Sequence, residues 1–206
     1  MRRAPRQALS ARIGDAIVEL LGHLPSTDEA ASTTPQARAL TIVEAASRKA
    51  ALVAGSLALP PGAWGWLTVM PELYAIWKIQ AQMVADIAGA YDRRWQLTRE
   101  QMLFCLFRHT AAQAFRDIAV QVGERWLIRA AGSASLHAIA RRVGVRVTER
   151  GIGSGIASWL PVVGAMGVGA YAWYDTRHVA RTAIALFAME SATSASWDGD
   201  ESALYD

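Results

Sequence analysis

The sequence predicts an all-α, single-domain helical bundle with two apolar helical hairpins that glycine and proline residues interrupt. Three observations predict this fold. Alanine dominates the apolar residues, and Val and Ile seldom alternate with polar residues as they do in half-buried strands. Apolar residues recur instead at the three- and four-residue spacing of a helix face. A length of 206 residues fits one domain with one sizeable core.

The N-terminal part predicts an amphipathic helix over residues 4–24. Its apolar positions lie opposite Arg12, Asp15 and Glu19, and they are Leu9, Ile13, Ile17, Leu20, Leu21 and Leu24. Pro25 ends this helix, because proline cannot continue a helical hydrogen-bond ladder. The Ser/Thr-rich segment 25–35 follows, and we expect it to form an exposed loop before a helical core of residues 36–193.

A second helix is expected to begin at Thr34, as N-cap, with Pro35 at the first helical position, and to run to about Leu59. It leads into residues 50–71, which contain no ionisable side chain and are interrupted by Pro60, Pro61 and Gly62. We call residues 50–71 the first neutral stretch. Neither half of it is long enough to span about 30 Å of hydrocarbon as a helix. The stretch therefore predicts a buried helical hairpin or a re-entrant loop.

Three further helices are expected before residue 151. The first runs from about Pro71 to Tyr91. Thr98 and Gln101 have the spacing of a capping box, which starts a helix that carries residues 102–122. The third helix has Ile139 and Val143 on one side and arginines on the other, and it ends at Gly151.

A second neutral stretch covers residues 151–174 and is interrupted at Pro161. A long helix is expected to follow it to about Ser191. The order of parts, an uncharged segment, a proline-centred break and a long helix, repeats that of the first neutral stretch and indicates a possible internal pseudo-repeat. Residues 194–206 are acidic and rich in small polar residues, so we expect a disordered tail.

The charge balance argues against a nucleic-acid partner. Lys+Arg 21 against Asp+Glu 18 gives a net charge of only +3, without one concentrated basic face. Basic residues do gather in segments 2–12 and 141–150, where they suit either anionic lipid headgroups or solvated helix faces. Almost all of them are arginines, as is usual in proteins of GC-rich bacteria.

Cysteine content and the N-terminal sequence bear on the compartment. The single cysteine, Cys105, excludes an intramolecular disulfide and, within an apolar run, is expected to be a small buried hydrophobe. Asp15 and Glu19 interrupt the segment in which a signal peptide has its apolar region. We therefore expect a cytoplasmic protein, peripheral or re-entrant at the inner membrane. A mean hydropathy of +0.15 lies between those of soluble and polytopic membrane proteins.

The two neutral stretches and their flanks resemble the EcsC family of bacterial proteins, over about residues 38–187. The resemblance is carried by Leu59–Gly62, Leu67–Leu73 and Ile79–Tyr91 in the first part, and by Leu160–Tyr171 with Val179–Ala183 in the second. It implies a helical, hydrophobic, often membrane-associated protein without an established reaction. Glu72 departs from the pattern, because an aspartate is expected at that position.

The candidate ligand-binding residues lie on the helices that follow the neutral stretches. Asp175 and His178 are spaced i,i+3 and Arg177 and Arg181 i,i+4, which predicts a polar patch that binds a phosphate or lipid headgroup or forms an internal ion-pair network. Glu72 either faces Asp175 across the pseudo-repeat or lies near a helix N-terminus. The full set is Glu72, Lys78, Trp173, Asp175, Arg177, His178 and Arg181, with Gln80 and Gln82 as further partners.

Aromatic residues flank the neutral stretches in the way that is typical of membrane interfaces, although aromatics also fill ordinary cores. Those expected to contact a membrane or an apolar ligand are Trp64, Trp66 and Trp159. The histidines show no metal-binding motif, and His109 and His137 fit boundary positions of amphipathic helices. No nucleotide-binding or serine-hydrolase motif is present, so we assign no catalytic residue, metal or cofactor.

The preferred hypothesis is a non-enzymatic helical protein that associates with the inner membrane or holds a lipid-like ligand. The first alternative is a soluble helical module for protein–protein interaction, with a protein partner or a second copy of the chain. The second alternative is a hydrolase that uses Glu72, Asp175 and His178.

Overall fold

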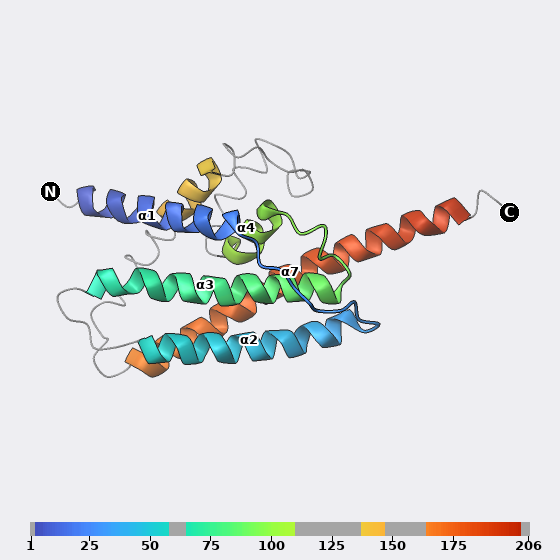
Figure 1. Cartoon of the computed structure of the whole chain (residues 1–206), viewed down its shortest axis with the longest axis horizontal. Helices are drawn as coiled ribbons and strands as arrows, with labels where there is room; N and C mark the ends of the chain where they lie inside the picture. The colour runs from blue at the N-terminus through green and yellow to red at the C-terminus, as the bar shows by residue number, and fades with distance from the viewer. Residues whose placement is uncertain (1–2, 58–64, 110–136, 147–163, 203–206) are drawn as a thin grey trace.

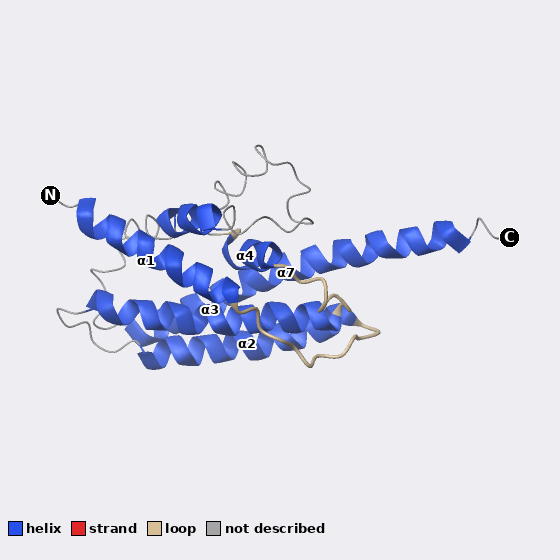
Figure 2. Ribbon diagram, turned by 45° about the horizontal axis from the view of Figure 1, so that its top comes forward, coloured by secondary structure: helices blue, strands red, loops and turns tan. Residues whose placement is uncertain are grey.

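The computed structural model describes residues 3–57, 65–109, 137–146 and 164–202, and these residues form helices joined by turns and loops. The predicted all-α class is confirmed, since no strand occurs within the described ranges. The helices are α1 (Arg3–Gly22), α2 (Pro35–Leu57), α3 (Gly65–Ala90), α4 (Arg99–Phe107), a helix over residues 137–146, and α7 (Gly164–Ser202). Figures 1 and 2 show their arrangement.

Three long helices form the centre of the bundle. α2 packs most extensively on α7, and α3 packs on both. α1 and α4 lie on α3, and α4 also contacts α7, so α3 lies between α2 and the α1–α4 pair (Figure 1). The C-terminal end of α2 and the N-terminal ends of α3 and α7 lie at the same end of the bundle (Figure 1).

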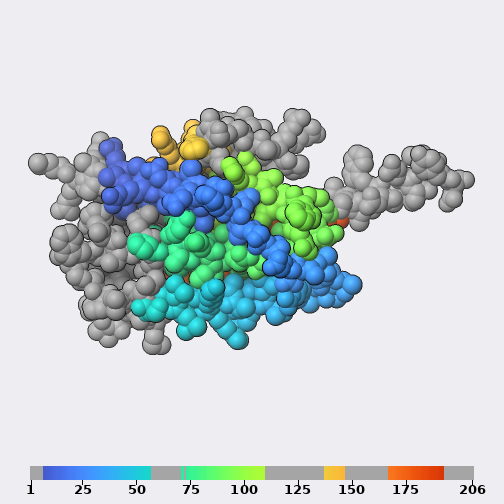
Figure 3. Space-filling model, in the orientation of Figure 1, coloured from blue at the N-terminus to red at the C-terminus, as the bar shows by residue number. Residues whose placement is uncertain are grey.

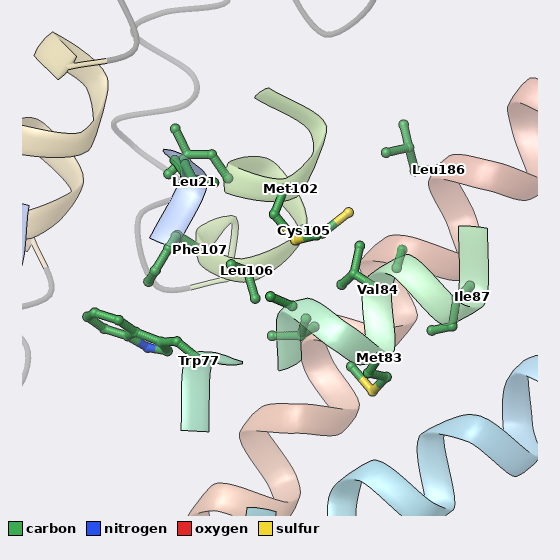
Figure 4. Packing of buried hydrophobic residues seen from close by; sticks show 14 of the residues in the cluster. Leu21, Trp77, Met83, Val84, Ile87, Met102, Cys105, Leu106, Phe107 and Leu186 are labelled. Atoms are coloured by element: carbon green, nitrogen blue, oxygen red, sulfur yellow. The ribbon is translucent and has the colours of Figure 1, made fainter. Parts of the chain in front are cut away.

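The main core lies where α1, α3, α4 and α7 meet. The predicted apolar face of α1 is buried at Ile13, Ile17, Leu20 and Leu21. Figure 4 shows side chains of α3 and α4 facing one another in this core. The ring of Trp77 packs edge-on against Phe107 with 5.2 Å between centroids. Cys105 is fully buried, and burial raises the pKa of its thiol far above the usual range, so it behaves as a hydrophobe as predicted.

The described ends of the two neutral stretches meet in a second, smaller apolar cluster. Its buried members are Ala50, Ala54, Ile76 and Ala172, with Ile79 and Val168 packed against them. α2 and α7 approach very closely here, because a Cβ added to Gly169 would lie 2.9 Å from the carbonyl oxygen of Ala51. The proline-containing centres of both stretches lie outside the described residues. Searched over the residues that are described, no helix is both long enough and apolar enough to cross a bilayer.

The N-terminal boundary of α3 differs from the prediction. α3 begins at Gly65 and contains Pro71, whereas we expected Pro71 to start the helix. Proline removes one backbone donor, the N–H that would bond the carbonyl of Leu67. The other helical hydrogen bonds and the packing of the apolar face keep the helix continuous, so a proline near a helix end was a poor marker of its first residue.

The C-terminal boundary of α7 also differs from the prediction. α7 continues to Ser202, past the expected end at Ser191 and through most of the segment for which we expected disorder. No proline stands in residues 191–202 to stop the helix, and each added residue gains one helical hydrogen bond. This end of α7 extends beyond the rest of the bundle (Figure 1).

Two local features were predicted with different success. The capping box is confirmed: Thr98 Oγ1 accepts from Gln101 N, and Thr98 N donates to Gln101 Oε1. Segment 25–35 is a loop as predicted, but it is not simply exposed. Thr27 Oγ1 donates to Asp86 Oδ1 at 2.7 Å, and the backbone N–H of Ser32 donates to the carbonyl of Ala90. The loop therefore lies across the C-terminal half of α3, as Figure 3 shows.

Candidate binding surface and polar cluster of α7

A polar cluster surrounds Asp175 on the inner side of α7. Asp175 Oδ1 lies 2.6 Å from His109 Nε2, and its Oδ2 accepts a 2.7 Å hydrogen bond from Gln80 Nε2. The side chains of His109 and Asp175 are only 23% and 18% exposed. Thr176 Oγ1 accepts from Gln80 and donates to the carbonyl of Ala172. We call His109, Asp175, Gln80, Thr176 and His178 the polar cluster.

His178 connects the polar cluster to the protein surface. Its ring stacks on that of His109 with 5.9 Å between centroids and an interplanar angle of 27°. The ring of Tyr174 also packs edge-on against His178, with 4.4 Å between centroids. His178 Nε2 is buried, and none of the residues that the structure describes forms a hydrogen bond with it. Tyr174, by contrast, is 56% exposed, so a half-buried imidazole contacts an exposed phenol directly.

The outer side of the N-terminal half of α7 carries exposed aromatic side chains. Tyr171 is 63% exposed, Tyr174 56% and Trp173 37%. Exposed aromatic rings that gather in this way form a candidate interaction surface. We call Tyr171 and Tyr174, which are spaced i,i+3 and share one face of α7, the aromatic surface; Trp173 lies beside it, about 100° from Tyr174 around the helix axis.

Arginines surround the aromatic surface. The guanidinium of Arg177 lies over the ring of Trp173, 4.4 Å from its centroid, and pairs with Glu44 of α2 at 3.2 Å. Glu44 also accepts from Arg48 at 2.9 Å. Arg181 is exposed, and the part of the chain that is described offers it no acidic partner. It lies two turns after Tyr174, about 20° away around the helix axis, and so shares its face.

The predicted ligand-binding residues of α7 fall into two groups. Asp175 and His178 belong to the polar cluster, whereas Trp173, Arg177 and Arg181 lie at or beside the aromatic surface. The predicted ion-pair alternative joined Arg181 to Asp175 or Glu72. The structure instead pairs Arg177 with Glu44, and it pairs Asp175 with His109.

The predicted partners on α3 differ in whether they face the polar cluster. Gln80 faces Asp175 as expected. Lys78 precedes Gln80 by two residues, so its side chain points to nearly the opposite face of α3. It is exposed, and its Nζ lies over the ring of Tyr74. Gln82 bonds Asp86 and the carbonyl of Ser26 instead. The expectation that Lys78 joins the patch on α7 is therefore wrong.

Gln80, and not Glu72, is the residue of α3 that bonds Asp175 in the described contacts. Glu72 precedes Gln80 on α3 by eight residues, about 12 Å along the helix axis, and its side chain lies outside the described part of the structure. Trp66 is in the first turn of α3. Trp64 and Trp159 lie outside the described residues.

Sequence analysis missed His109 and Glu44 as partners of α7. They lie 66 residues before Asp175 and 133 residues before Arg177, so no local spacing could connect them. The available signal was indirect: a carboxylate or a guanidinium within a packed helix requires a partner, but several residues could supply one.

The chemistry of the polar cluster is limited. The Asp175–His109 contact fixes the orientation of one imidazole, as carboxylate–histidine pairs do. Searched over the described residues, no three His, Cys, Asp or Glu side chains come together to hold a metal ion. No protein-family model matches the sequence, and neither the curated proteins nor the solved structures contain a match.

Proposed function

We propose that the protein binds the surface of an anionic membrane through the aromatic surface of α7. The observation that carries the proposal is the exposure of Tyr171 and Tyr174, which are spaced i,i+3 on one face of α7, with Trp173 exposed beside them. Tyrosine and tryptophan favour the membrane–water boundary, where the ring is half dry and the polar group remains hydrated.

The charges around the aromatic surface favour an anionic membrane over a neutral one. Arg48, Arg177 and Arg181 stand against one carboxylate, that of Glu44. The net of two positive charges contributes about 2 kcal/mol to binding at an anionic lipid surface, or about 30-fold in partitioning. Salt screens this contribution.

The position of the surface supports the same proposal. The aromatic surface lies in the N-terminal half of α7, at the C-terminal end of the second neutral stretch, and this part of α7 packs against the beginning of the first neutral stretch at Ala50 and Ala54. In a peripheral membrane protein, several apolar segments can contact the lipid at the same time only if they lie at the same end of the molecule. The resemblance to the EcsC family implies membrane association as well.

Co-sedimentation with lipid vesicles tests the proposal. Wild-type protein is expected to bind vesicles of phosphatidylglycerol and phosphatidylcholine, and to bind phosphatidylcholine vesicles much less. The double variant Tyr171→Ser, Tyr174→Ser is expected to lose most of this binding. Trp95→Ser is the matched control, because Trp95 is 90% exposed but lies in the turn after α3, away from α7's N-terminal half.

Two results would count against membrane binding. The first is a wild-type protein that stays in the supernatant with anionic vesicles at low salt. The second is equal loss of binding in the Trp95 variant and in the double tyrosine variant, which would show that exposed apolar area in general, not this surface, drives sedimentation.

A further inference from the structure

His178 lies between the aromatic surface and the polar cluster. Its ring contacts both Tyr174, which belongs to the aromatic surface, and His109 of the polar cluster. A change in His178 therefore reaches the exposed aromatic side chains without any intermediate residue.

The polar cluster contains two imidazoles and one carboxylate. Asp175 lies against His109, and the group that α3 contributes is the uncharged amide of Gln80. On α7 the titratable or charged neighbours of His178 are Tyr174, Asp175, Arg177, which pairs with Glu44 of α2, and, one turn later, Arg181. The carboxylate of Asp175 already lies against His109, so the described residues of the cluster offer a protonated His178 no second carboxylate.

The buried nitrogen of His178 has no acceptor. A protonated imidazole carries an N–H on both nitrogens, and each needs an acceptor. Among the described residues, none accepts from Nε2 of His178. Leaving a charged donor unpaired in a buried position is costly, so a protonated ring gains by turning toward water. Histidine is the side chain that ordinarily changes charge between about pH 5 and pH 8.

We propose that His178 is a pH-sensitive switch for the aromatic surface: uptake of a proton breaks the stack on His109, frees Tyr174 and tightens binding to an anionic membrane. The last step rests on the proposed membrane binding, but the break in the stack does not. The added positive charge beside Arg181 acts in the same direction as the freed ring.

Vesicle binding at about pH 7.5 and about pH 5.5 tests the switch. Wild-type protein is expected to bind anionic vesicles about fivefold more tightly at the lower pH, the effect of one added positive charge near the lipid. His178→Phe keeps an aromatic ring and removes both nitrogens. Between the two pH values, its vesicle binding should therefore change only as much as the other titratable groups of the protein cause. His23→Gln, at an exposed histidine of the bundle, sets the control and should keep the wild-type pH response.

NMR of the protein alone separates the switch from membrane binding. The cross-peak between the rings of Tyr174 and His178 is expected at about pH 7.5 and should be lost at about pH 5.5, with folding retained. Loss of this cross-peak in a protein that binds no vesicles would uphold the switch and remove the membrane. A cross-peak that persists at both pH values, or a His178→Phe variant with the full wild-type pH response in vesicle binding, would overturn the switch.

Discussion

Substitution of Gly169 by alanine tests the close packing of α2 on α7, which brings the ends of the neutral stretches together. Two effects compete. Alanine in a helix interior is favoured over glycine by about 1 kcal/mol. The new Cβ would lie 2.9 Å from the carbonyl oxygen of Ala51, a backbone atom that moves only if the helices separate. Such overpacking costs about 1–3 kcal/mol.

The expected net result is a loss of about 1 kcal/mol, since the middle of the overpacking range exceeds the helix gain. For a chain of this length that loss lowers Tm by about 2–4 °C. Thermal and denaturant unfolding followed by circular dichroism measure it. Gly14→Ala is the control, because the nearest atom to its added Cβ is at 3.4 Å, an ordinary contact with Arg141. This control should be neutral or stabilising.

A Gly169→Ala variant at least as stable as the Gly14→Ala variant would refute the reasoning, because it would show that α2 and α7 leave room for a methyl group. Gly169→Val offers a second check. It adds further methyl groups at the same contact and lacks most of alanine's helix advantage, so it should lose more stability than Gly169→Ala.

Three further predictions concern other parts of the fold. Thr98→Ala removes the capping box of α4 and should cost about 1 kcal/mol in the free energy of unfolding; an unchanged denaturation midpoint would contradict it. Asp86→Ala removes the acceptor of Thr27, so limited proteolysis should cut the 25–35 loop faster, and equal cutting rates would show that the loop is held otherwise. Burial raises the pKa of Glu190, which favours its protonated form in the folded state. The stability that this group contributes is therefore present at acidic pH and is lost as pH rises through the raised pKa. Glu190→Gln should show a smaller fall in Tm toward neutral pH than the wild-type protein, and parallel curves of Tm against pH for the two proteins would argue against this.

The helices could be predicted because their signals are local. The apolar spacing of α1 recurs every three or four residues, and the Thr98 capping box needs only four consecutive residues. Pro35 marks the beginning of α2 through a property of its own backbone. Boundaries were less predictable where packing outweighs propensity: Pro71 lies inside α3, and nothing in the residues after Ser191 forces α7 to stop.

The site could be predicted only in part. The i,i+3 and i,i+4 spacings correctly placed Asp175, Arg177, His178 and Arg181 on one stretch of helix, since helical geometry determines them. The partner of each residue depends on which helix packs against α7 and in what register. That information is tertiary, and so the sequence suggested Gln80 as one of several partners on α3 but did not indicate His109 as a partner of Asp175.

The most direct test of membrane binding by α7 is the depth of a spin label attached at residue 171. In a Tyr171→Cys variant the label attaches selectively, because the native Cys105 is fully buried and its raised pKa suppresses the reactive thiolate. With anionic vesicles, a label at residue 171 should gain access to oxygen and lose access to a water-soluble nickel complex. A label in Trp95→Cys should remain in water. A label at residue 171 that stays as hydrated as the one at residue 95 while the protein is bound to vesicles would contradict the proposal.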